Sequence, residues 1–119
     1  MLLQGKMIED YIMSVQESDW KKFRAKLPVW QENYMDKLTK EYIEILRSNE
    51  QASSRFWALE KRIKEDRKSP GVVISPSRSE MEMDLFYLMR DGAITEEELN
   101  DFSEELSDRV MSLYRTFMD

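Results

Sequence analysis

The clearest helical pattern in the chain lies in residues 81–118, MEMDLFYLMRDGAITEEELNDFSEELSDRVMSLYRTFM. Its second half repeats large apolar residues every three or four positions: Leu99, Phe102, Leu106, Val110, Leu113 and Phe117. Residues with this spacing lie on one face of a helix. Asp91-Gly92 separates this helix from the apolar one before it, and glycine commonly ends a helix. The stretch therefore predicts an αα-hairpin, two antiparallel helices joined by a short turn.

Two capping-box patterns predict where the helices of this hairpin begin. Ser77-Arg78-Ser79-Glu80 and Thr95-Glu96-Glu97-Glu98 each place a glutamate three residues after a hydroxyl side chain. In such a box the hydroxyl accepts a backbone N–H of the first turn, and the glutamate reaches back to the capping residue. We therefore expect one helix to follow Ser77 and a second to run from Thr95 to the end of the chain.

Helical spacing continues through the first 46 residues, where three pieces are expected. The first carries one apolar face: Met7, Ile8, Tyr11, Ile12 and Val15. Ser18 suits the N-cap of a short turn that holds Trp20 and Phe23. Pro28 suits the first turn of a new helix, where a missing N–H has no consequence.

A further helix is expected after Asn49, which can cap it. Its inner face would be formed by Ala52, Phe56, Leu59 and Ile63. Pro70-Gly71 should stop it near Ser69, and Val72-Val73-Ile74 is typical of extended chain.

These elements predict an all-α fold, a compact bundle of four to five helices that ends in the antiparallel hairpin. The chain has only three glycines and three prolines in 119 residues, too few for the many turns of an all-β fold. We expect one domain over residues 1–119, with N-terminal helices in 6–68, an extended linker at 69–76 and the hairpin at 77–118.

The composition also limits the chemistry that the chain can perform. It has no Cys and no His, which removes thiolate chemistry, disulfides, the commonest general base and the commonest transition-metal ligand. No glycine-rich phosphate-binding sequence occurs. The prediction is therefore a protein that is not an enzyme, with no cofactor and no evident small-molecule substrate. No signal-peptide pattern and no apolar run of membrane-spanning length is present, so we expect a cytoplasmic protein without membrane contact.

Residues 91–99 resemble the second half of an EF-hand loop, with a glycine at the turn and a glutamate at its end. The first half differs, because Tyr87 and Met89 occupy positions that should supply oxygen ligands. Only Asp91 and Glu98 remain as donors, and calcium requires six to eight. We therefore predict a structural turn and no metal site.

The net charge of −6 is unevenly distributed along the chain. Residues 1–79 carry 15 basic and 12 acidic side chains, whereas residues 80–119 carry 3 basic and 12 acidic ones. This division favours docking of the acidic hairpin on the basic middle of the chain. Its acidic helix face, with Glu97, Asp101, Glu104 and Asp108, is interpreted as solvated, although a cation or a basic partner stays open.

Two surfaces are candidate binding sites. Met83, Phe86 and Tyr87 lie off the main apolar stripe of their helix, so that helix is either the centre of the bundle or part of a protein interface, and we favour the interface and, in particular, a homodimer. Trp57 shares a helix face with Lys61, Lys64 and Lys68, which could bind an anion or nucleic acid. A pI near 4.8 disfavours nucleic acid, and we expect Trp57 to be buried by packing instead. The leading hypothesis is a protein–protein interaction or regulatory module, and the alternative is a nucleic-acid-associated regulator.

Overall fold

The computed structural model describes residues 2–118, and all of their side chains except those of residues 2–4, 6 and 14. Its elements, in chain order, are α1 Leu2–Leu46, α2 Ala52–Asp66, η1 Arg78–Glu80, α3 Met81–Arg90, η2 Glu96–Asp101 and α4 Glu104–Met118, where η marks a 3₁₀ helix. No β-strand occurs in residues 2–118. The predicted all-α class is confirmed.

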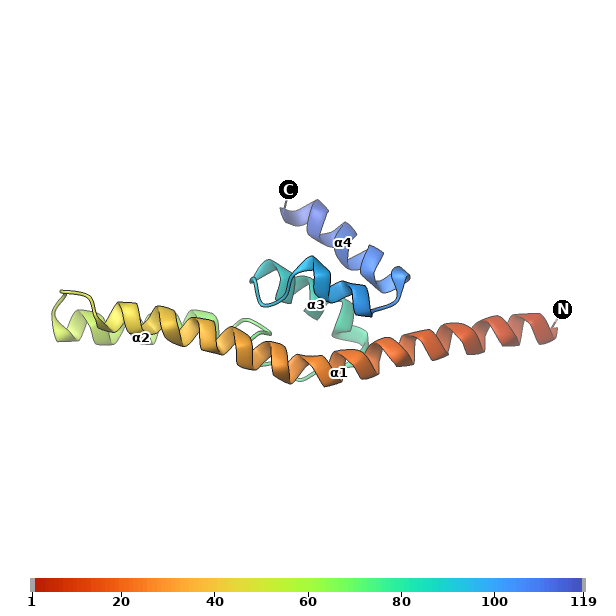
Figure 1. Ribbon diagram of the computed structural model, residues 1–119, viewed down its shortest axis with the longest axis horizontal. Helices are drawn as coiled ribbons and strands as arrows, with labels where there is room; N and C mark the ends of the chain where they lie inside the picture. The colour runs from red at the N-terminus through yellow and green to blue at the C-terminus, as the bar shows by residue number, and fades with distance from the viewer. Residues whose placement is uncertain (1, 119) are drawn as a thin grey trace.

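The molecule is long and thin, with principal extents of 73 × 28 × 20 Å. Its radius of gyration is 18.8 Å, whereas a compact domain of this length would have about 13.5 Å. Figure 1 shows α1 running the whole length, with α2 folded back along its C-terminal half. Residues 78–118, here called the head, gather on the middle of α1, and the N-terminal part of α1 extends beyond them.

A single helix replaces the three pieces expected in the first 46 residues. Neither Ser18 nor Pro28 interrupts α1, so the prediction of a new helix at Pro28 was wrong. Proline inside a helix costs about 3 kcal/mol, because it lacks an N–H and crowds the preceding turn. Pro28 and Val29 are exposed, so water can bond the freed carbonyl group. On the opposite side, burial of Leu27 and Trp30 against the head holds the helix together across the proline.

The core lies between the middle of α1 and the head. It is formed by large apolar side chains from α1, α3, the turn after α3, η2 and α4: Trp20, Phe23, Leu27, Trp30, Met81, Leu85, Leu88, Met89, Ile94, Leu99, Phe102, Leu106 and Val110. Aromatic rings connect the layers, with ring centroids 6.3 Å apart for Phe23 and Trp30 and again for Trp30 and Phe102. The acidic segment thus docks on α1, and not on the basic face of α2.

One buried carboxylate fixes the start of α4. Asp19 is 4% exposed and accepts hydrogen bonds from the backbone N–H of Ser103 at 2.8 Å and from its hydroxyl at 2.6 Å. The Ser103 hydroxyl in turn accepts the N–H of Leu106 at 3.2 Å, which is an N-cap bond. The predicted helix from Thr95 is therefore divided, because η2 ends at Asp101 and α4 begins only after this cap.

Polar contacts hold α2 against α1, since α2 has no buried residue. Tyr42 donates its hydroxyl hydrogen to Asp66 at 2.5 Å, and Arg62 pairs with Glu41 at 3.2 Å and with Asp66 at 3.0 Å. Asn49 is not the cap of this helix, because Gln51 precedes its first turn and makes no side-chain capping bond.

Residues 67–77 connect α2 to the head through turns and extended chain. Gly71 passes directly over the ring of Tyr34, where a Cβ atom would lie 2.5 Å from Cδ2. Ser69 is buried, donates to Asp91 at 2.6 Å and accepts the N–H of Gly71 at 3.1 Å. Of the predicted extended run, Ile74 packs on the core and Val73 is exposed.

Candidate functional site

The first turns of α1 carry large apolar side chains that the described part of the chain leaves largely exposed. Met7 is 70% exposed, Ile8 60%, Tyr11 68% and Ile12 47%, and Val15 is half-buried. These five residues are here called the N-terminal stripe. Scattered exposed apolar residues are normal on a protein surface, but a contiguous row on one helix face marks an interaction site.

Helix geometry explains why the head leaves this stripe uncovered. At 100° per residue, the stripe is centred roughly 110° around α1 from the row that binds the head, which includes Trp20, Phe23 and Leu27. The stripe is therefore not a continuation of the core face. It lies in the N-terminal part of α1, and its residues Tyr11, Ile12 and Val15 come beside the start of α4.

A groove runs beside the stripe where α1 meets the start of α4. It encloses about 250 Å³ and is lined by residues of both helices: Tyr11, Ile12, Val15, Gln16, Asp19, Ser103, Glu105 and Arg109. A neighbouring hollow of about 380 Å³ shares Tyr11, Val15 and Asp19 and extends to Lys22 and Phe102. The stripe and the groove thus form one continuous surface, apolar along α1 and polar along α4.

On the other side of the junction between α1 and the head lies a hollow of about 650 Å³, and two ion pairs are among the groups that line it. Arg78 of η1 donates two hydrogen bonds to Glu17, at 2.9 and 3.1 Å, and these bonds lower the pKa of the Glu17 carboxyl. Arg109 of α4 pairs with Glu82 of α3. Of these two pairs, Arg78–Glu17 joins α1 to the head and Arg109–Glu82 lies within the head.

The predicted interface of Met83, Phe86 and Tyr87 is not an open surface. Phe86 is 5% exposed, with ring centroids 5.9 Å from Phe117 and 5.5 Å from Tyr87. Met83 and Tyr87 are half-buried. The expectation that Phe86 faces a partner is therefore corrected: the C-terminal turn of α4 covers it, and the 69% exposed Phe117 forms the outer layer.

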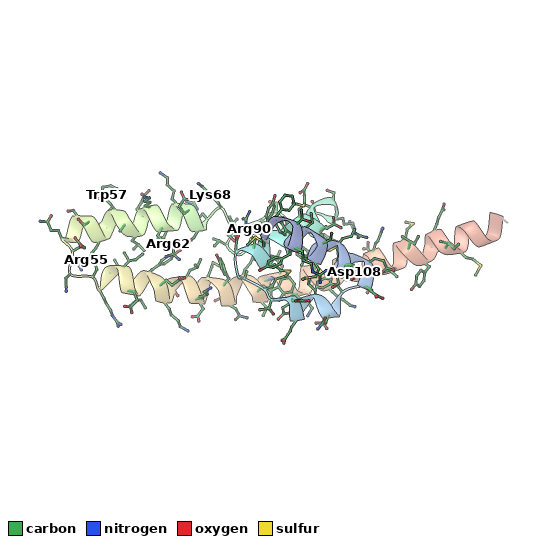
Figure 2. All side chains as sticks on the ribbon, turned by 90° about the horizontal axis from the view of Figure 1, so that it is seen from above. Arg55, Trp57, Arg62, Lys68, Arg90 and Asp108 are labelled. Atoms are coloured by element: carbon green, nitrogen blue, oxygen red, sulfur yellow. The ribbon has the colours of Figure 1, made fainter. Side chains whose placement is uncertain are left out.

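Trp57 is 63% exposed, which overturns the expectation that packing buries it. In Figure 2, Trp57 and Lys68 both lie on the side that points away from α1. Its ring stands edge-on to Phe56 with centroids 4.9 Å apart. Lys61 and Lys64 are exposed on α2 and Lys68 just after its end, although Lys64 pairs with Glu60 at 3.7 Å and Lys68 with Glu65 at 3.2 Å.

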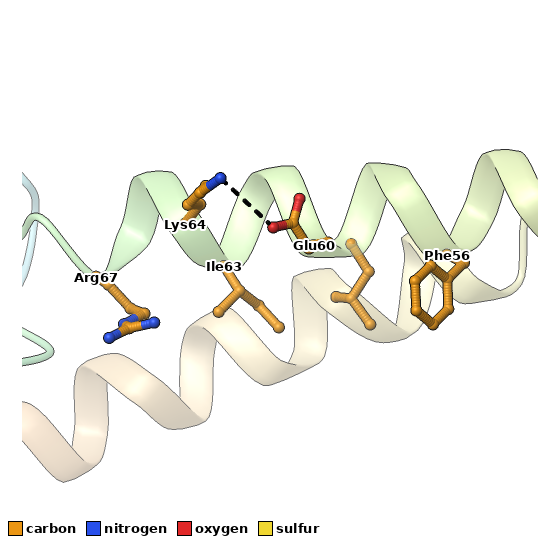
Figure 3. A pocket seen from close by; sticks show the side chains of 6 residues that line it. Phe56, Glu60, Ile63, Lys64 and Arg67 are labelled. Carbon is orange, nitrogen blue, oxygen red and sulfur yellow. Dashed lines mark ion pairs between the residues drawn. The ribbon is translucent and has the colours of Figure 1, made fainter.

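The apolar face of α2 is only partly covered by α1. Phe56, Leu59 and Ile63 line an open hollow of about 330 Å³, with Glu60, Lys64 and Arg67 at its rim (Figure 3). Phe56 is 64% exposed and Ile63 38%. The sequence correctly groups these apolar residues on one face, but two helices alone cannot bury it.

The turn that resembles half of an EF-hand engages its two carboxylates separately. Asp91 accepts hydrogen bonds from Ser69 and Arg90, and Glu98 accepts the indole N–H of Trp30 at 3.2 Å. Gly92 has φ +79°, the left-handed conformation that ends α3. In the described part of the chain, no three acidic side chains gather closely enough to hold a metal ion.

Comparison with models of protein families, with curated proteins and with solved structures finds no significant match. None of the helices in residues 2–118 combines the length and the apolar composition needed to span a lipid bilayer.

The sequence places the five stripe residues on one helix face, but by itself it did not mark that face as an exposed surface. The exposure becomes predictable only when α1 is known to be one continuous helix. Once residues 7–38 belong to one helix, the sequence alone gives the offset between the stripe and the core row. The expected breaks at Ser18 and Pro28 concealed that offset.

Proposed function

We propose that this protein is a non-catalytic helical module that binds another protein through the N-terminal stripe. The observation that carries the proposal is the row of four side chains between 47% and 70% exposed on a helix segment outside the core. The free energy gained by removing such a row from water is about 25 cal/mol per Å² of apolar surface. The adjoining groove adds polar groups of α4 that can fix the orientation of a partner.

This proposal is tested by comparing the cellular proteins that wild type binds with those bound by a variant in which one stripe residue is charged. Immobilised wild type and Tyr11→Glu are exposed to an extract of the source cells, with Met13→Glu as the matched control. Met13 is 66% exposed on the same segment, about 170° around the helix from the stripe. We expect a protein, which can be a second copy of this chain, that wild type and Met13→Glu retain and Tyr11→Glu loses. If wild type and both variants retained the same set of proteins, the proposal would be contradicted.

A nucleic-acid-associated regulator is the second candidate, and the exposure of Trp57 supports it. A ring that is 63% exposed beside three exposed lysines can stack on a base while the lysines neutralise phosphates. The exposed carboxylates beside two of these lysines, and the net charge of −6, oppose it.

Tryptophan fluorescence tests this second candidate directly. Trp20 and Trp30 are buried, so quenching by a single-stranded oligonucleotide would report on Trp57. Binding through this face requires quenching that weakens steeply with salt and disappears in Trp57→Phe. Unchanged fluorescence at low salt would exclude stacking on Trp57.

A further inference from the structure

We infer that the partner of the N-terminal stripe is a second copy of this chain, bound antiparallel, so that the two stripes cover each other. This inference rests on the proposed function, because it identifies the occupant of the same surface. The apolar pattern of the stripe, the area it offers and the charge of the heads support it independently.

The apolar pattern is itself two-fold symmetric. Ile8, Tyr11, Ile12 and Val15 are placed symmetrically about the midpoint between Tyr11 and Ile12. In an antiparallel pair centred there, Ile8 of each copy lies opposite Val15 of the other, and Tyr11 lies opposite Ile12. A two-fold interface requires this property, since residue i must contact j wherever j contacts i.

The surface also has the size that a dimer of this kind needs. At roughly 100–130 Å² for each of its five side chains, the stripe buries about 600 Å² per copy, against about 800 Å² in a standard interface. The groove supplies additional area. The groove, which Gln16, Glu105 and Arg109 line, also borders Val15, the residue that Ile8 of the second copy faces. Helix and groove together therefore reach the standard size.

Charge selects the antiparallel direction. Residues 80–119, which form most of the head, carry 12 acidic and 3 basic side chains. In a parallel pair the two heads would lie side by side. The antiparallel pair centred between Tyr11 and Ile12 separates the two Trp20 positions by about 25 Å along the axis, at 1.5 Å per residue. That separation exceeds the Debye length of about 8 Å at physiological salt, so the acidic heads are screened from each other.

The absence of cysteine from the chain makes the arrangement directly testable by disulfide trapping. Three single variants are oxidised alone and in mixture: Ile8→Cys, Ile12→Cys and Val15→Cys. In the antiparallel pair, Ile12→Cys lies next to the two-fold axis and links to itself. Ile8→Cys and Val15→Cys each stay unlinked, because like residues are about 10 Å apart along the axis and a disulfide spans at most about 7 Å between Cα atoms. When Ile8→Cys and Val15→Cys are mixed, a disulfide forms between one copy of each variant.

Light scattering on the unmodified protein accompanies the trapping. Wild type and Met13→Glu should show twice the chain mass of 14.3 kDa, and Tyr11→Glu should weaken the dimer at least about tenfold, because it places a charge in the seam. Self-linking of Ile8→Cys alone, or a dimer insensitive to Tyr11→Glu, would overturn the inference.

A monomer at every concentration would overturn the second-copy inference as well. In that case, retention of a different protein that depends on Tyr11 would leave the proposed function standing. A monomer with no such retention would overturn both.

Discussion

At the scale of the residue, a few polar contacts determine how the long helices are joined. Tyr42 connects α1 to α2 through Asp66, and Asp19 caps α4 from the side of α1. Hydrogen bonds of this kind contribute about 0.5–1.5 kcal/mol each, and more when one partner is charged. They matter here because α2 has no buried apolar residue.

The Tyr42 contact predicts a loss of stability in alkali. Desolvation and the hydrogen bond to Asp66 raise the pKa of Tyr42 from 10 to about 12. Below pH 10 the phenol is neutral in both states. Between pH 10 and 12 it ionises in the unfolded chain first, so the free energy of unfolding falls as pH rises. Urea denaturation across this range should show a smaller fall for Tyr42→Phe, and equal pH dependence in both proteins would argue against the contact.

Gly71 predicts a steric cost. In Gly71→Ala the new Cβ would lie 2.5 Å from Cδ2 of Tyr34, so the ring or the loop must move. Overpacking of this kind costs about 1–3 kcal/mol, measurable as a lower melting temperature. Gly5→Ala is the control, because nothing lies within 4 Å of its Cβ position and alanine favours a helix interior. Equal melting temperatures for Gly71→Ala and wild type would show that the loop is not held against Tyr34.

At the scale of the element, the sequence predicts helices well and their connections poorly. Of the apolar row predicted from Leu99 to Phe117, the residues up to Val110 are buried as expected, whereas Leu113 is half-buried and Phe117 is exposed, and Gly92 ends α3. Local signals failed where tertiary contacts decide. Thr95 carries a capping pattern but makes no side-chain capping bond, and α4 is capped by Ser103, which donates two hydrogen bonds to Asp19, distant in sequence. Pro28 is a local break signal, yet packing on the head carries the helix through it.

A continuous helix α1 and a helix break at Pro28 predict different effects of Pro28→Ala on the stability of the protein. If the proline lies inside the helix and faces solvent, Pro28→Ala restores a backbone hydrogen bond and should stabilise the protein, by up to about 3 kcal/mol. If the proline began a separate helix, alanine would bring no such gain. Chemical denaturation of the two proteins distinguishes these cases, and a destabilised Pro28→Ala would contradict the continuous helix.

At the scale of the whole molecule, α1 carries two separate surfaces, one that packs on the head and one that is exposed. Its middle forms the core with the head, and its first turns carry apolar residues about 110° away from that core. The candidate surface was visible in the sequence only as an apolar face. Its exposure depends on how far the head extends along α1, which no local pattern encodes. Conversely, Phe86 looked available and is buried, because the end of α4 folds over it.

The central claim is that the N-terminal stripe is uncovered in the single chain and covered in the functional assembly. Amide hydrogen exchange of residues 7–15, measured at low and at high protein concentration, tests it most directly. We predict slower exchange in this segment at high concentration in wild type and in Met13→Glu, but not in Tyr11→Glu. Residues 20–30, which pack on the head, should not change. Exchange in residues 7–15 that is equally slow at all concentrations in all three proteins would contradict the claim, because the stripe would then be covered within one chain.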